Sequence, residues 1–182
     1  MCHFISAVIP HTADSQDLTA LARAHHKKLE PFENPSITKQ LHSNERLYLT
    51  TASRCDCGSP LVSWPPAQAP DLGKLEAKLK RKGWTDSKVA RSLAQQAAHD
   101  SRRDTAAIDA ERPDLENWHA FLVAALNSER VPYVGLMVHS FTGPMDGPVT
   151  LRGRRAEPLP PKPDDLLGFL QEDWLYEICR TA

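Results

Sequence analysis

Residues 133–141 read YVGLMVHSF, the clearest strand pattern in the chain, because β-branched and apolar residues dominate it. The next seven residues, TGPMDGP at 142–148, combine two glycines and two prolines, a composition typical of tight turns. Residues 149–155 are therefore predicted to return as the hairpin partner of this strand. This hairpin points to a sheet that is at least partly antiparallel.

Outward from this hairpin, strand and helix patterns alternate along the chain. Further strands are predicted at 3–9 and 46–51. Helices are predicted to begin near capping residues, namely Asp14 or Ser15, Asp71, Thr85, Asp114, and Asp164 or Asp165. The fold class that follows is α+β, with a small mixed or antiparallel sheet of about four strands and the helices packed on one side.

The composition is that of an ordinary globular protein. The chain has 182 residues, 41% of them hydrophobic, and a formal net charge of −1. We expect a single domain over 1–182, with proline-rich connectors near 63–70 and 157–163. No targeting pattern and no stretch long enough to cross a membrane is present, which predicts a cytoplasmic protein with reduced thiols.

Two of the four cysteines lie in the loop Arg54-Cys-Asp-Cys-Gly, and a third, Cys2, lies at the start of the first predicted strand. Together with His3, these thiols of Cys2, Cys55 and Cys57 form a candidate zinc ligand set of three cysteines and one histidine. The two segments meet only if the strands at 3–9 and 46–51 run antiparallel. The alternatives are a tight turn with inert thiols and no cofactor at all.

Cys2 is also a candidate nucleophile. If the initiator Met is removed, the α-amine lies beside the thiol and can act as its base. His139, in the strand at 133–141, is the candidate acid or base for this chemistry and otherwise a structural residue. The Met-Cys start is similar to that of the class II glutamine amidotransferases and of the family that traps abasic DNA sites, although both have Gly where this chain has His3.

Residues 72–91 carry seven basic and two acidic residues, which makes this segment strongly positive. Its pattern of two capped helices around Gly83 is close to a helix-turn-helix, but Ser92 stands where that motif needs an apolar residue. We therefore expect no nucleic-acid partner. An acidic protein fits such a patch better, and the expected contact residues are Lys78, Lys80, Arg81, Lys82, Lys88 and Arg91.

No phosphate-binding glycine loop, HExxH, GxSxG or dinucleotide fingerprint occurs in the sequence. That absence favours a binding protein over an enzyme. The basic segment and an acidic C-terminal segment supply opposite charges for steering a protein partner. The leading hypothesis is a small cytoplasmic protein that docks another protein, in the manner of an immunity protein or antitoxin. The alternatives are a cysteine-dependent enzyme using Cys2 with His139, and a zinc-binding domain.

Four stretches together carry a resemblance: MCHFI at 1–5, NERLYLTTASRCDCGSPL at 44–61, VGLMVHSFTGPM at 134–145 and EDWLYE at 172–177. They resemble a group of uncharacterised small bacterial proteins. The resemblance spans most of the chain, which implies a bacterial source and one domain, and it implies no activity.

Overall fold

The computed structural model describes residues 2–52, 54–62, 72–128 and 131–180. The connector expected at 63–70 lies outside these residues. Two compact units divide the chain, one made of Met1–Ser63 with Pro113–Ala182 and the other of Trp64–Arg112. Each unit is described by itself below.

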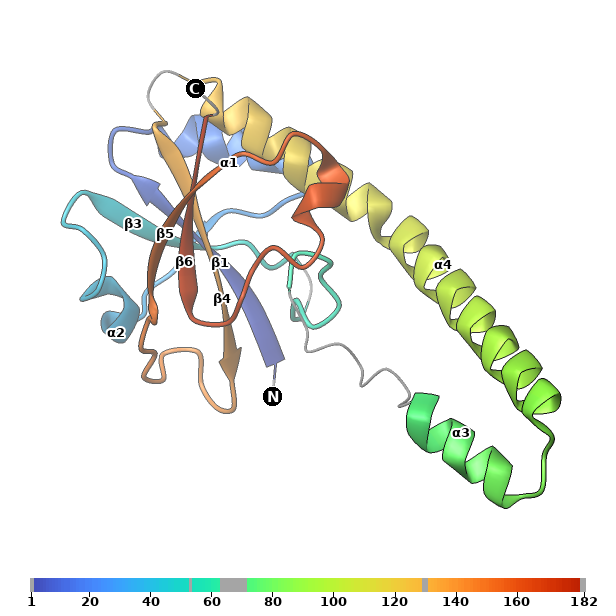
Figure 1. Cartoon of the computed structure of the whole chain (residues 1–182). Coiled ribbons are helices and arrows are strands. Elements are labelled where there is room, and N and C mark those ends of the chain that lie inside the picture. Colours follow the sequence, from blue (N-terminus) through green and yellow to red (C-terminus); the bar gives the residue numbers. More distant parts are fainter. Residues whose placement is uncertain (1, 53, 63–71, 129–130, 181–182) are drawn as a thin grey trace. The chain divides into compact units, whose positions relative to one another are not determined.

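The first unit is built on a six-stranded sheet of order β2-β3-β1-β4-β6-β5 (Figure 1). The strands are β1 (Cys2–Pro10), β2 (Glu30–Pro31), β3 (Glu45–Leu49), β4 (Tyr133–Phe141), β5 (Gly153–Pro158) and β6 (Trp174–Cys179). All neighbours pair antiparallel except β5 and β6, which run parallel. The α+β class and the mixed sheet are confirmed, whereas the expected number of about four strands is too low.

Most of the helical cover lies on one face of the sheet. Alternate β1 residues Ile5, Ala7 and Ile9 are buried there against α1 (Ser15–Ala24) and the last three turns of α4 (Asp86–Leu126). The opposite face has a smaller core, which includes Val8 and Met137 and is covered partly by α2 (Pro35–Thr38) through Ile37. Helices therefore lie on both faces, although unequally.

The hairpin expected between 133–141 and 149–155 is wrong. β5 begins at Gly153 and pairs with β6, and β6 occupies the place beside β4 where the hairpin partner was expected. The connector expected at 157–163 starts inside β5, because Glu157 and Pro158 still pair with β6. A local turn signal such as 142–148 predicts a reversal of the chain, but it does not determine which strand becomes the neighbour.

The C-terminal helix expected from Asp164 or Asp165 is also wrong. Only a 3-10 turn, η1 (Pro163–Leu166), forms, and Gly168 then takes a left-handed φ of 64°. The following residues form β6, with Leu175 buried on one face and Tyr176 and Ile178 in the core of the other. A strand buried on both faces reads as a continuous apolar run, which periodicity does not distinguish from a helix.

The second unit consists of α3 (Leu72–Arg81) and the first part of α4. Gly83 has a left-handed φ of 77° between them, as expected for the residue that follows a helix. α4 continues through Pro113, where the sequence pattern predicted a new helix. Among the helices that the structure describes, none combines the length and hydropathy that a bilayer-spanning segment needs.

A network of charged side chains, in which Glu45 is buried and Arg154 and Glu177 are half-buried, joins β3 to β5 and β6. Arg154 donates to both carboxylate oxygens of Glu45, at 2.8 and 2.7 Å, and to Glu177 at 2.8 Å. The side chain of Glu45 has no exposed surface, and it also accepts from the Tyr133 hydroxyl. Although burial opposes ionisation, these hydrogen bonds lower the pKa of Glu45 to about 2. Glu45 is therefore ionised inside the fold.

Candidate functional site

The three thiols of Cys2, Cys55 and Cys57 converge at one end of the sheet. Each of their Sγ atoms lies within 4.8 Å of the others. The antiparallel pairing of β1 with β3 brings them together, because Ser6 lies opposite Leu49 and the chain after β3 then runs toward the start of β1. None of the four cysteines is in a disulfide. The predicted meeting of Cys2 with the 55–57 loop is thus present.

Asp56, between the two loop cysteines, attaches the loop to β1. Its backbone N–H donates to the carbonyl of His3 at 2.7 Å, and its carboxylate accepts from the backbone N–H of Ile5 at 2.7 Å. The Thr51 hydroxyl donates to the same carboxylate oxygen. Asp56 therefore continues the β1–β3 ladder beyond the end of β3, which places the thiols on either side of it next to Cys2.

We expect Asp56→Ala to disturb this arrangement and Asp56→Asn to preserve it, because the amide oxygen of Asn accepts the same hydrogen bonds. The alanine variant leaves the Ile5 N–H unpaired, at a cost of about 1–3 kcal/mol in unfolding free energy. Urea denaturation of both variants and the parent measures the difference. Equal losses in the two variants would show that the carboxylate does not act as this acceptor.

His3 lies beside the thiol cluster and is bonded to it twice. Its backbone N–H donates to Sγ of Cys57 at 3.3 Å, and its Nδ1 lies 3.9 Å from the same sulfur. Burial lowers the pKa of the His3 imidazole, which favours the neutral form that binds metals. The hydroxyl of Ser140, which lies opposite His3 in β4, is buried and has no partner among the described residues.

Cys55 and Asp56 also line a cavity of about 390 Å³. Its other notable residue is Lys27, whose side chain is only 8% exposed, forms an ion pair with Asp114 and lies 4.5 Å from the centre of the Trp118 ring. Burial lowers the pKa of Lys27, and Asp114 opposes that shift. The cavity therefore joins a buried lysine–carboxylate pair to one thiol of the cluster.

His139, the alternative acid or base for Cys2, pairs with a carboxylate. Its Nδ1 lies 2.6 Å from Oδ1 of Asp173, and its ring makes an edge contact with Phe141, 4.4 Å between centroids. It lies on β4 opposite Phe4, two positions before the residue opposite Cys2. The sulfurs nearest Cys2 in this part of the protein belong to Cys55 and Cys57. Cys2 therefore lies next to the thiols of Cys55 and Cys57, and His139 lies next to the carboxylate of Asp173.

The six predicted partner-binding residues belong to the second unit, on α3, the turn after it and the start of α4. All are exposed: Lys78, Lys80, Arg81, Lys82, Lys88 and Arg91. Lys80 forms ion pairs with Glu76 and Asp86, and Lys88 lies over the ring of Trp84 at 4.2 Å. Part of the positive charge is thus balanced within the unit itself.

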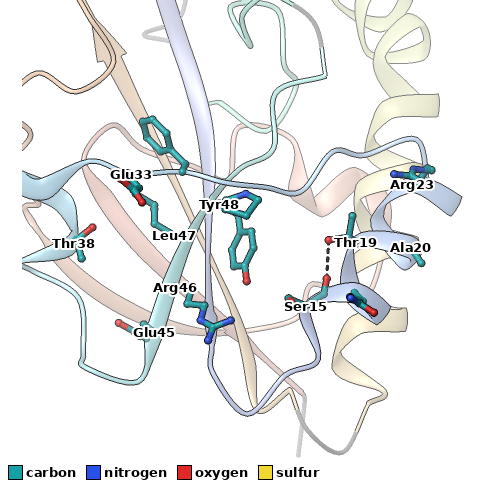
Figure 2. A pocket seen from close by; sticks show the side chains of 13 residues that line it. Ser15, Thr19, Ala20, Arg23, Glu33, Thr38, Glu45, Arg46, Leu47 and Tyr48 are labelled. Carbon is teal, nitrogen blue, oxygen red and sulfur yellow. Dashed lines mark hydrogen bonds between the residues drawn. The ribbon is translucent and has the colours of Figure 1, made fainter.

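A separate cavity of about 570 Å³ lies between α1 and the outer edge of β3 (Figure 2). Tyr48 and Leu47 contribute apolar surface to its wall. Thr19 and Glu45 also line it, but Thr19 donates to the Ser15 carbonyl and Glu45 is engaged by Arg154. None of the residues that line this cavity is a cysteine or a histidine, so the reactive groups lie at the thiol cluster instead.

Sequence reasoning missed the pair of Lys27 and Asp114, as well as the contacts of Asp173. Lys27 and Asp114 are 87 residues apart, and each has an ordinary helix-flanking role in the sequence pattern. For the thiol cluster, one local feature of the sequence was informative: Asp56 lies between the two loop cysteines. In the structure Asp56 bonds to β1 and so holds these cysteines beside Cys2.

Three comparisons with known proteins place the chain in no family. No protein-family model matches it, and neither a curated protein nor a solved structure does.

Proposed function

We propose that the chain is a zinc-binding domain, in which the thiolates of Cys2, Cys55 and Cys57 hold the metal and His3 is the fourth ligand. One observation carries the proposal: three sulfurs from two distant segments lie within 4.8 Å of one another. Thiolate and imidazole donors favour zinc over magnesium or calcium, which prefer oxygen.

The spacings fit a tetrahedral centre. With Zn–S bonds of about 2.3 Å and Zn–N bonds of about 2.0 Å, two sulfurs lie about 3.8 Å apart and a sulfur and a nitrogen about 3.5 Å apart. The separation of 3.9 Å between Cys57 Sγ and His3 Nδ1 is close to this value, but His3 is not among the residues whose ligand atoms lie within 4.8 Å of one another, so its ring has to move toward Cys2 and Cys55 to complete the site. The hydrogen bond from the His3 N–H to Cys57 Sγ is of the kind that stabilises a metal-bound thiolate.

Such a metal links the start of β1 to the loop at 54–59, because it has ligands from both segments. That loop contributes Cys55, Asp56, Gly58 and Ser59 to the wall of the 390 Å³ cavity. Holding the loop in place thus holds the wall of the cavity that contains Lys27. The proposed function is a zinc centre that shapes a small polar binding pocket.

Metal analysis of the purified protein tests this proposal. We expect one zinc per chain, and we expect cobalt substitution to produce thiolate-to-cobalt charge-transfer absorption together with the strong d–d bands of a tetrahedral site. In the His3→Ala variant the charge-transfer absorption persists while the d–d bands shift. A folded protein that is free of metal, with all its thiols titratable or with a disulfide among the three, would overturn the proposal.

The docking of a protein partner, in the manner of an immunity protein, stays a prediction. It rests on the exposed basic residues of α3 and the start of α4. Two acidic residues of the C-terminal segment are already engaged, because Asp173 pairs with His139 and Glu177 with Arg154. The zinc centre therefore has more support than the docking function.

A further inference from the structure

A second group of metal-ligating side chains lies where the turn before β6 meets β4. His139, Glu172 and Asp173 each offer one ligand atom, and these atoms lie within 4.8 Å of one another. All three residues are half-buried. The donors are one nitrogen and two carboxylate oxygens, in contrast to the sulfurs of the Cys2 cluster.

Backbone contacts hold this turn against the strand that carries His139. The N–H of Asp173 donates to the carbonyl of Val138 at 2.9 Å, and Glu172 forms a bridge with the same residue. On the other side, the N–H of Arg152 donates to the carbonyl of Asp173 at 2.8 Å. The ring of Phe141 packs edge-on against the imidazole of His139. The three donors are therefore positioned by the fold.

The charge of this group is incompletely balanced. Asp173 bonds to His139. Within the described residues no hydrogen bond or ion pair of Glu172 is present, although its negative charge acts on the nearby imidazole of His3. Two half-buried carboxylates beside one imidazole repel each other, and a cation placed between them removes that repulsion.

A comparable trio shows what a balanced site looks like. His42, Glu45 and Glu177 also lie within 4.8 Å of one another, but Arg154 bonds to both of those carboxylates. In that trio the guanidinium of Arg154 supplies the positive charge that a metal ion would otherwise supply. No lysine or arginine of the described part of the chain forms an ion pair with Glu172 or Asp173. The two trios thus differ in whether a cationic side chain pairs with their carboxylates, and this difference supports a bound cation.

We propose that His139, Glu172 and Asp173 form a second cation site, which binds a divalent transition metal through one imidazole nitrogen and two carboxylate oxygens. This donor set, dominated by carboxylate oxygens, suits manganese or iron better than it suits a thiol-seeking metal. Binding replaces the proton shared by His139 and Asp173 and moves Nδ1 and Oδ1 from 2.6 Å to about 3 Å apart. Three protein ligands leave further positions for water.

Titration of the zinc-loaded protein with Mn²⁺, followed by the loss of the free-ion electron paramagnetic resonance signal, tests the proposal. We expect one Mn²⁺ per chain. Glu172→Gln is the decisive variant, because its carboxylate has no bond within the described residues and its loss leaves the melting temperature unchanged. Its affinity for Mn²⁺ falls by at least about tenfold. Asp173→Asn lowers the affinity too, and also loses the bond to His139.

Asp146→Asn removes an exposed carboxylate from the turn after β4 and is the matched control, with unchanged Mn²⁺ affinity. Cys57→Ser separates the two sites, since it affects the proposed zinc centre and leaves Mn²⁺ binding intact. Absence of stoichiometric Mn²⁺ binding, or equal binding by the parent and Glu172→Gln, overturns the second site whatever the outcome at the thiols.

Discussion

Replacing Cys57 by serine is expected to remove the zinc and to lower the melting temperature by roughly 10 °C. A ligand present at a thousand times its dissociation constant stabilises the folded state by about 4 kcal/mol. For a chain of this length each kcal/mol corresponds to about 2–4 °C. Cys57 is the residue to change, because its sulfur contacts both the backbone and the ring of His3. Calorimetry and metal analysis on the same preparation measure both effects.

Cys179→Ser is the control for this experiment. Cys179 belongs to β6, and its thiol donates only to the carbonyl of Glu157 at 3.5 Å. We expect this variant to keep its zinc and to melt within a few degrees of the parent. A strong chelator should destabilise the parent and Cys179→Ser and have no further effect on Cys57→Ser. If the two serine variants behave alike, the thiol cluster does not hold a stabilising metal.

Arg154→Ala is expected to destabilise the protein by about 3–5 kcal/mol, the cost of leaving a buried charge without its partner. The guanidinium binds Glu45 through both carboxylate oxygens and also reaches Glu177. Its removal leaves a carboxylate with no exposed surface and only a tyrosine hydroxyl and one backbone N–H as donors. Urea denaturation at neutral pH measures the loss of unfolding free energy.

The adjacent variant Arg155→Ala is the matched control. The guanidinium of Arg155 lies over the ring of Trp174 at 3.8 Å, a contact that contributes about 0.5–2 kcal/mol. Its loss should therefore cost much less. Equal effects of the two substitutions would mean that the ion pair is not what stabilises this part of the sheet.

The effect of pH gives a second measurement on the same variants. Because the pKa of Glu45 falls from 4.5 to about 2 on folding, its contribution is complete above pH 4.5 and is lost as the pH falls through about 2. The difference in stability between the parent and Arg154→Ala should narrow over that range. A difference that stays constant down to pH 2 would contradict the assigned role of Glu45.

Several elements could be predicted from local patterns. The strand at 133–141 coincides with β4, and Asp14 caps α1 as expected. The zinc hypothesis required that 3–9 and 46–51 run antiparallel, and β1 and β3 do so. The helix predicted from Asp164 or Asp165 through Trp174 is wrong, because its apolar spacing belongs to a short 3-10 turn and to the start of β6, a strand with both faces buried.

The sequence by itself determined the α+β class and the identity of the three thiols as candidate ligands, because residue type and short-range periodicity are local properties. Only the tertiary structure decided that β6 separates β4 from β5, that Lys27 meets Asp114 and that Asp173 binds His139. The two side-chain contacts join residues 34 and 87 positions apart. The physical reason is that burial of both sheet faces and strand register select such pairs, and no local pattern in the chain encodes them.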